Sequence, residues 1–190
     1  MKKSLQIKPW KVKNARYIIK NRWITVRADT CATAEGVVIA PYYILEYPDW
    51  VHMVVVDRNN KILITRQYRH GAQQIVAELP CGTVDPRDKT PRASAKRELM
   101  EETGYTGNFA LVGVTSPNPA THTNSIYTYV VTHPIQRNIP VHNPYEVMSY
   151  EFVEMKEILR LIENKEFTQA LHISDLFLAL RKVGIKLPAR

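Results

Sequence analysis

The hydrophobic and polar positions along the chain predict many short strands and few helices. Residues 52–57 (HMVVVD) are strongly apolar between their two end positions, which is typical of a buried strand. A polar turn at 58–60 (RNN) separates it from 61–68 (KILITRQY), so the two segments predict a hairpin. The other segments expected to form strands are 15–20, 23–28, 36–40, 42–47, 78–82, 109–115, 126–132 and 146–153.

Three segments carry the signals of a helix. Thr90 is a good N-cap, Pro91 suits the first helical position and Gly104 suits the C-cap, so a helix is expected over 91–103. Two more helices are expected at 156–164 and 167–183. Strands interspersed with few helices indicate an α/β sandwich with a mixed sheet, and not a doubly wound parallel sheet.

Composition fits one ordinary globular domain with a small extra sheet. The chain has 190 residues, of which 45% are hydrophobic and 23% charged. The sequence has no apolar run near the roughly 18 residues of a membrane span and no signal-peptide pattern, so a cytoplasmic protein without membrane contact is expected. Cys31 and Cys81 form neither a disulfide framework nor a zinc motif.

The positive charge is concentrated at the N-terminus. Residues 1–22 carry eight basic residues and no acidic ones, whereas the whole chain has a net charge of +8, so the remaining residues sum to zero. Such a segment can attract a polyanion or can be a solvated tail. We favour the solvated tail, because the rest of the chain is not basic and a nucleic-acid partner is therefore not expected.

The segment 96–105 (KRELMEETGY) carries the clearest chemistry. On a helix Glu98, Glu101 and Glu102 share one edge of a turn, where like charges repel. Hard divalent cations prefer carboxylate oxygens, and Mg²⁺ shares its coordination shell with substrate phosphates. The cluster therefore suits a Mg²⁺ ion on a diphosphate. The alternative is a solvated acidic face, with Arg97 and Glu101 spaced for one ion pair.

The spacing around this helix favours the metal site, because it resembles the Nudix box, G-x5-E-x7-R-E-U-x-E-E-x-G-U, where U is apolar. The core matches from Arg97 to Gly104, and Gly82 stands at the first position. Two departures are visible: Asp88 stands where the family has glutamate, and eight residues separate it from Arg97. The additional residue falls in the loop before the helix, where insertions are tolerated.

The resemblance implies roles for the residues of the box. Glu98 and Glu102 would be the main metal ligands, with Glu101 on a further metal or on a water. Arg97 would orient the cluster. Two further contacts are implied near the first position: Gly82 would let the backbone approach the metal, and the backbone carbonyl of Cys81 is a candidate ligand.

Residues 64–82 (ITRQYRHGAQQIVAELPCG) narrow the class, because they resemble the segment before the box in ADP-ribose and nucleoside-diphosphate-sugar pyrophosphatases. Arg69 suits a diphosphate, since a guanidinium offers a planar fork of donors, and Arg66 is the weaker candidate. The resemblance places Glu78 near a ribose hydroxyl or a metal. Each of these could instead be an ordinary residue at a strand end.

The general base remains open between three residues. The catalytic-loop acids of this branch correspond to 143–146 (NPYE), where Glu146 is the remaining acid and the best candidate. Glu101 and His122 are the alternatives. His122 stands where the branch has a glutamate after the box, and it is also a candidate for substrate contact.

The resemblance implies a fold, a reaction and an assembly. The expected fold is a Nudix-type α/β/α sandwich over 48–190, with a small N-terminal antiparallel sheet over 1–47 that is exchanged in a homodimer. The expected reaction is Mg²⁺-dependent hydrolysis of a small-molecule nucleoside diphosphate linked to X, with Mn²⁺ as a substitute metal. The products would be a nucleoside monophosphate and a phosphorylated X. Five aromatic residues are candidates for base stacking or for the core and interface: Trp23, Tyr42, Tyr43, Tyr47 and Trp50.

Two other functions are considered. One is a ligand-sensing Nudix fold without turnover, which the presence of all three box glutamates argues against. The other is hydrolysis of capped RNA, which only the basic N-terminus suggests. Deleting residues 1–13 would test the RNA hypothesis, because the deletion should weaken RNA cleavage and leave hydrolysis of a small nucleotide sugar nearly unchanged.

Overall fold

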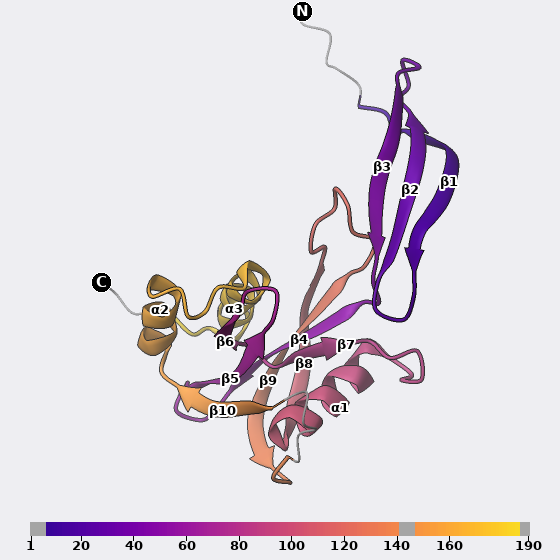
Figure 1. Cartoon of the computed structure of the whole chain (residues 1–190). Helices are drawn as coiled ribbons and strands as arrows, with labels where there is room; N and C mark the ends of the chain where they lie inside the picture. The colour runs from indigo at the N-terminus through magenta and orange to yellow at the C-terminus, as the bar shows by residue number, and fades with distance from the viewer. Residues whose placement is uncertain (1–6, 141–146, 187–190) are drawn as a thin grey trace, which may run out of the picture. The chain divides into compact units, whose positions relative to one another are not determined.

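The computed structural model describes residues 7–140 and 147–186, which form two compact units. One unit contains the N-terminal segment up to Tyr47 together with Ser116–Asn124, and the other contains the rest of the chain. Both are visible in Figure 1. None of the helices in the described ranges has the length and apolar character needed to cross a bilayer.

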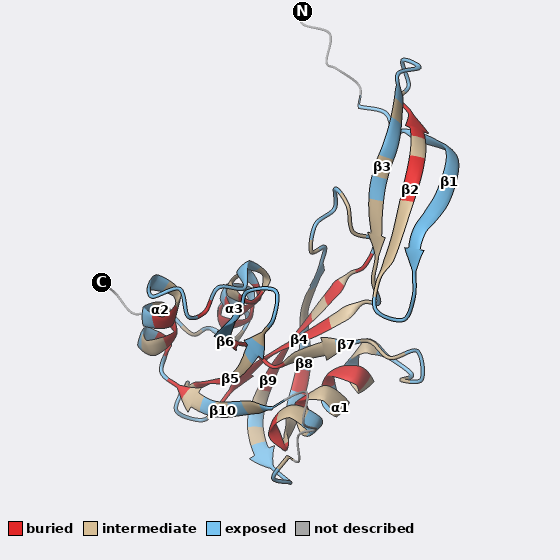
Figure 2. Cartoon of the chain, viewed as in Figure 1, coloured by how far each residue is buried: buried red, intermediate tan, exposed pale blue. Residues whose placement is uncertain are grey.

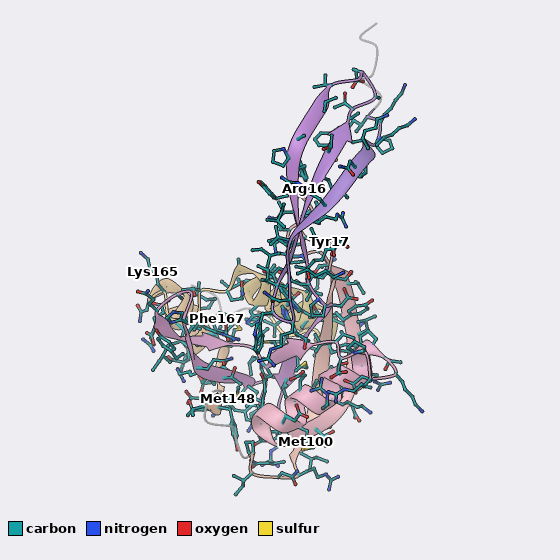
Figure 3. All side chains as sticks on the ribbon, turned by 45° about the vertical axis from the view of Figure 1, so that its right-hand side comes forward. Arg16, Tyr17, Met100, Met148, Lys165 and Phe167 are labelled. Carbon is teal, nitrogen blue, oxygen red and sulfur yellow. The ribbon has the colours of Figure 1, made fainter. Side chains whose placement is uncertain are left out.

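The first unit is built on a three-stranded antiparallel sheet in the order β1-β2-β3. Strand β1 spans Lys11–Lys20, β2 spans Thr25–Ala32 and β3 spans Val38–Glu46. The two segments expected at 36–40 and 42–47 are therefore one continuous strand. All ten residues of β1 are exposed, which Figure 2 shows as an unbroken pale blue ribbon. Arg16 and Tyr17, labelled in Figure 3, lie on this strand.

The second unit is built on a seven-stranded mixed sheet with the central order β10-β5-β4-β9-β8. Strands β4 and β9 pair in parallel, whereas the other pairs are antiparallel. The strands are β4 (Trp50–Val56), β5 (Ile62–Arg69), β6 (Gln74–Glu78), β7 (Cys81–Thr83), β8 (Tyr105–Thr115), β9 (Ile126–Gln136) and β10 (Met148–Val153).

The expected hairpin of β4 and β5 forms, but its two strands pair only at Val56 and Ile62. Strand β4 then leaves β5 and pairs with β7 and β9, so it occupies the centre of the sheet. A local turn signal could not reveal this separation, because the competing partners come from distant parts of the sequence.

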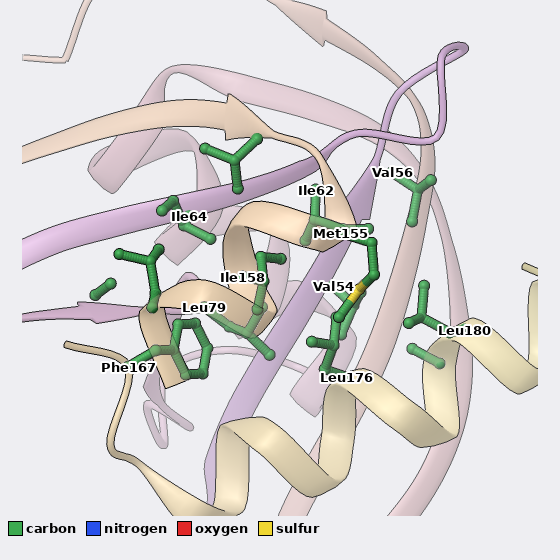
Figure 4. Close-up of a cluster of buried hydrophobic side chains, with 14 of the residues drawn as sticks. Val54, Val56, Ile62, Ile64, Leu79, Met155, Ile158, Phe167, Leu176 and Leu180 are labelled. Carbon is green, nitrogen blue, oxygen red and sulfur yellow. The ribbon is translucent and has the colours of Figure 1, made fainter. Parts of the chain in front are cut away.

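Helices cover both faces of this sheet. Helix α1 (Pro91–Thr103) packs on one face through a cluster that includes Leu99 and Met53. Helices α2 (Met155–Glu163) and α3 (Ala170–Val183) pack on the other face through the cluster drawn in Figure 4. Alternate residues of β4 enter the two clusters, which explains why residues 53–56 are apolar without interruption. The predicted sandwich with a mixed sheet is confirmed.

The ends of α1 agree with the prediction. The side chain of Thr90 accepts a hydrogen bond from the amide of Ala93, and Pro91 begins the helix. Gly104 ends it with a φ of 72°. A Cβ at Gly104 would lie 1.9 Å from the backbone oxygen of Asn138, so the close approach and the left-handed backbone both require glycine.

We predict that Phe167→Ala destabilises the protein by about 3–5 kcal/mol, because Phe167 is fully buried in the α2 and α3 cluster and its removal leaves a cavity. The measurement is urea unfolding. The matched control is Phe177→Ala on α3. The Phe177 side chain is exposed, so its removal should change the free energy of unfolding little. Equal midpoints for the two variants would contradict the assignment of this cluster as the core.

Candidate metal and diphosphate site

The glutamates of α1 lie against the short strand β7. The amide of Cys81 donates a hydrogen bond to Glu102 Oε2 at 3.2 Å. A Cβ added at Gly82 would lie 2.2 Å from Cδ of Glu98, so only glycine leaves room for this carboxyl group. Glu98 and Glu102 are four residues apart and both face β7, as the spacing of the box predicts. The first glycine of the box is therefore a spatial requirement of its glutamates.

Arg97 gathers three carboxylates. Its guanidinium donates to Asp88 at 3.1 Å, to Glu98 Oε1 at 2.9 Å and to Glu101 Oε2 at 2.9 Å. Asp88 therefore reaches Arg97 despite its shorter side chain and the additional residue in the loop. Because Glu98 and Glu101 both bind the guanidinium of Arg97, this side chain can fix the orientation of their carboxylates.

The electrostatics of the cluster favour a cation. Burial raises the pKa of Glu102 well above its ordinary value, and the nearby Glu98 carboxylate adds to the increase. Burial also raises the pKa of Glu98, although Arg97 opposes this effect. Two enclosed carboxylates therefore carry a cost when both are ionised, and a divalent cation between them would remove it.

The described residues contain no group of three acidic, histidine or cysteine side chains that already converges as a metal cage. The carboxylates of Glu98 and Glu101 are directed to Arg97 instead. The chemistry of the donors nevertheless fits a hard cation that keeps several waters, because Mg²⁺ is usually held by one or two carboxylates and by substrate phosphates.

Arg69 and Glu78 form an ion pair beside the glutamates. Two nitrogens of Arg69 donate to Glu78 Oε2 at 2.9 and 2.6 Å, and Gln67 donates to the same oxygen at 3.3 Å. Burial acts to lower the pKa of Arg69, but the bonds to Glu78 outweigh it and raise the pKa. Because the Arg69 side chain is 42% exposed, part of its guanidinium stays open to a ligand.

These groups line one cavity of about 950 Å³, which is large enough for a nucleotide-sized ligand. The glutamates of α1 and the Arg69–Glu78 pair lie in its wall, and Met148 of β10, labelled in Figure 3, also lines it. The cavity thus brings together Trp50 of the stacking candidates and seven of the candidate metal, catalytic and substrate-binding residues: Arg69, Glu78, Cys81, Gly82, Glu98, Glu101 and Glu102.

Three other candidates are not part of this group. Arg66 is paired with Glu151 of β10 and does not line the described cavity. His122 belongs to the first unit, where its ring stacks on Tyr47 with a centroid distance of 5.6 Å. Glu146 lies outside the described residues.

The thiol of Cys81 lines the cavity but is poorly suited to act as a nucleophile. Burial and the Glu102 and Glu78 carboxylates raise its pKa well above the ordinary value, so the reactive thiolate is disfavoured. Both cysteines of the chain are free. The participation of Cys81 is therefore best sought in its backbone.

Sequence reasoning missed a buried polar network in the same wall. His52 of β4 hydrogen-bonds Asp175 of α3, and His172 of α3 also lines the cavity. The signals were a histidine at the start of the apolar run 52–57 and an aspartate within an apolar helix. Neither signal indicates its partner, because His52 and Asp175 are 123 residues apart.

Comparison with known proteins identifies two domains along the chain. The NUDIX domain matches residues 47–173, and the nucleoside diphosphate sugar hydrolase N-terminal domain matches residues 10–45. The first match covers well over half of the chain. The second covers the segment that contains β1 and β2 and nearly all of β3.

Several curated proteins are similar in sequence. The ADP-ribose pyrophosphatase of Bacillus subtilis is 28% identical over 67% of this chain and 69% of its own length. The ADP-ribose pyrophosphatase of Saccharomyces cerevisiae is 27% identical over 77% of this chain, and the matched region covers 56% of that protein's length. The methanol dehydrogenase activator of Bacillus methanolicus is 37% identical, but over only a third of each chain.

The fold is also similar to a solved structure. A crystal structure of an ADP compounds hydrolase superposes with a TM-score of 0.80 over 95% of this chain and 99% of that one, at 20% identity. That likeness concerns the fold alone. Together with the domain match over residues 47–173 and the glutamates set against Gly82, it leads to one assignment: the chain belongs to the Nudix family of pyrophosphohydrolases.

Proposed function

We propose that this protein hydrolyses the diphosphate bond of a nucleoside diphosphate linked to X, where X is ribose or another sugar, in a Mg²⁺-dependent reaction. The observation that carries the proposal is the placement of Glu98 and Glu102 against β7, in one cavity with Arg69. The similarity to ADP-ribose pyrophosphatases and the N-terminal domain of nucleoside diphosphate sugar hydrolases support this substrate class.

In this proposal Glu98 and Glu102 hold the metal, with Glu101 and the backbone carbonyl of Cys81 as further ligands. Bound Mg²⁺ would lower the pKa of a water and neutralise charge on the diphosphate oxygens. Mn²⁺ is expected to substitute for it. Arg97 would fix the carboxylates of Glu98 and Glu101 through the hydrogen bonds described above.

The remaining groups would bind the substrate and move a proton. Arg69 would hold the diphosphate, with its guanidinium oriented by Glu78. Glu146 would take the proton from the attacking water, and Glu101 and His122 are the alternatives. Of these two alternatives, Glu101 is the one that lines the cavity, and its side chain is 59% exposed although it is paired with Arg97.

The test of this function is a panel of ADP-ribose, several nucleotide sugars and dinucleoside polyphosphates, each incubated with Mg²⁺. We expect two phosphomonoester products from ADP-ribose or a nucleotide sugar, namely a nucleoside monophosphate and a sugar phosphate. Inactivity toward the whole panel with Mg²⁺ and with Mn²⁺ would overturn the proposal and favour a sensing role.

We further propose that two copies of the chain associate through the N-terminal sheet. The supporting observation is that β1 is exposed along its whole length while it carries large apolar side chains, including Tyr17, Ile18 and Ile19. Exposed apolar groups of this size on an edge strand are a liability unless a partner covers them. A second copy is the partner expected for this family branch.

We predict that Glu102→Gln abolishes Mg²⁺-dependent hydrolysis, because the variant keeps the size of the side chain and loses the charge that binds the metal. Without metal, its stability relative to the wild type should increase as the pH rises above the ordinary glutamate pKa. The raised pKa of Glu102 means that ionisation costs stability as the pH increases, and glutamine removes this cost. The control is Glu163→Gln at the end of α2. Full activity of Glu102→Gln would contradict the metal assignment.

We predict that Gly82→Ala folds but responds poorly to Mg²⁺, because the new Cβ displaces the carboxyl group of Glu98. The measurement is the increase in melting temperature on addition of Mg²⁺ with a nonhydrolysable ADP analogue. Gly113→Ala is the control, since a Cβ there meets nothing within 4 Å. An unchanged response of Gly82→Ala would show that the position of Glu98 does not matter for the metal.

We predict that light scattering of the wild type gives twice the chain mass of 21.9 kDa, and that Ile18→Glu with Ile19→Glu gives a monomer. Two charges on β1 would be costly to bury in an interface. Ile135→Glu is the control, because that exposed residue lies on β9 of the other unit. A monomeric wild type would exclude the dimer.

A further inference from the structure

The wall of the cavity contains a buried network that the proposed reaction does not use. His52 Nδ1 lies 2.6 Å from Asp175 Oδ2, and Thr128 donates a hydrogen bond to the other oxygen of Asp175 at 2.7 Å. The ring of His172 meets the ring of His52 edge to face, with centroids 4.5 Å apart. His172 Nδ1 accepts a hydrogen bond from the amide of Leu79 at 3.2 Å.

These contacts fix which atom of each ring is available. The amide of Leu79 can only donate, so Nδ1 of His172 carries no proton and Nε2 carries it. Burial and the neighbouring His52 lower the pKa of His172, which keeps this ring neutral. The carboxylate of Asp175 can only accept, so Nδ1 of His52 carries its proton toward Asp175. In both rings Nε2 is therefore the nitrogen that remains available to a ligand.

A structural role accounts for the Nδ1 atoms but not for the Nε2 atoms. Among the described residues, the hydrogen bonds of His52 and His172 all use Nδ1. Both rings line the cavity, although the two residues are only 4% and 2% exposed. Neither Nε2 atom is among the fully buried side-chain atoms that lack a partner in the described residues, so each Nε2 keeps some access to the cavity, where a ligand can reach it.

We propose that His52 and His172 form a hydroxyl-binding subsite, in which their Nε2 atoms hold the hydroxyl groups of a sugar ring of the substrate. His172 offers a donor there. A hydroxyl group both donates and accepts, so it can also satisfy His52 in either protonation state. Glu78, Glu98 and Glu102 line the same cavity, and their negative charge disfavours any phosphate that neither a metal ion nor an arginine neutralises, so neutral hydroxyl groups suit the subsite better.

The subsite rests on the proposed function, since it assigns one part of the substrate of the same cavity. The hydroxyl groups can come from the ribose of the nucleoside or from the sugar of X. These two sources share one chemistry, and ligands that lack one set of hydroxyls distinguish them.

The test uses variants that keep the hydrogen-bonding group at the position of one ring nitrogen and remove it at the other. In His172→Asn the amide oxygen can replace Nδ1 toward Leu79, but nothing reaches the position of Nε2. In His172→Gln the amide nitrogen can replace Nε2, while the bond to Leu79 is lost. His52→Asn and His52→Gln form the same pair toward Asp175. The Gln variants are therefore matched controls for the Asn variants.

Binding is measured by calorimetry with EDTA, so that no turnover occurs, and the ligands are ADP-ribose, ADP and 2′,3′-dideoxy-ADP. We expect each Asn variant to lose about tenfold in affinity for the ligand with the recognised hydroxyls, as one missing hydrogen bond implies. The Gln variants should lose less affinity, although His172→Gln should lose more thermal stability.

The ligand pairs identify the source. Loss of the discrimination between ADP-ribose and ADP assigns the subsite to the sugar of X, whereas loss of the discrimination between ADP and dideoxy-ADP assigns it to the nucleoside. Either result supports the subsite. Retention of both discriminations in both Asn variants overturns it, as does a wild type that discriminates neither pair.

A second measurement needs no variant and covers the case in which the variants do not fold. Long-range ¹⁵N NMR of the wild type should show the Nε2 resonances of His52 and His172 shifting when ADP-ribose is added. Unshifted Nε2 resonances at saturating ligand overturn the subsite. If the wild type hydrolyses ADP-ribose while these tests fail, only the subsite is wrong; if it hydrolyses nothing in the panel, the proposed function is wrong.

Discussion

Repulsion between the carboxylates of Glu98 and Glu102 is the constraint around which the cavity is organised. Helix geometry places the two side chains on one face, and burial against β7 removes the water that would screen them. Arg97 compensates Glu98, and the amide of Cys81 compensates Glu102, but both pKa values remain raised. The remaining imbalance is what a divalent cation would correct, so the proposed metal site follows from the packing of α1 on β7.

The glycines of the box are required by close packing and backbone conformation, and they take no part in the chemistry. Gly82 is required because a Cβ would occupy the place of the Glu98 carboxyl group. Gly104 is required because α1 ends there in a left-handed conformation close to Asn138. A short sequence pattern can therefore specify a three-dimensional site, because its fixed positions record the close approaches between one helix and its neighbours.

Local sequence signals predicted the parts of the fold that depend on nearby residues. The caps of α1 and the buried strand β4 follow from Thr90, Gly104 and the apolar run 52–57. Strand ends were less predictable: β1 begins at Lys11 and not at residue 15, because pairing with β2 extends it through a polar stretch.

The site was predictable to a similar degree. The box glutamates and Arg69, which were selected from the sequence, lie in the wall of one cavity. The pairing of Arg66 with Glu151 and of His52 with Asp175 was not predictable, because these partners are 85 and 123 residues apart and no periodicity links them. Sequence reasoning identifies groups that can bind a ligand, but the structure decides which of them are already engaged with another side chain.

The most direct test of the account is a titration of the wild type with Mn²⁺, followed by electron paramagnetic resonance, beside the double variant Glu98→Gln with Glu102→Gln. The account predicts stoichiometric Mn²⁺ binding by the wild type, competition by Mg²⁺ and no binding to the folded double variant. Equal Mn²⁺ binding by the wild type and the double variant would contradict the claim that these two carboxylates hold the metal.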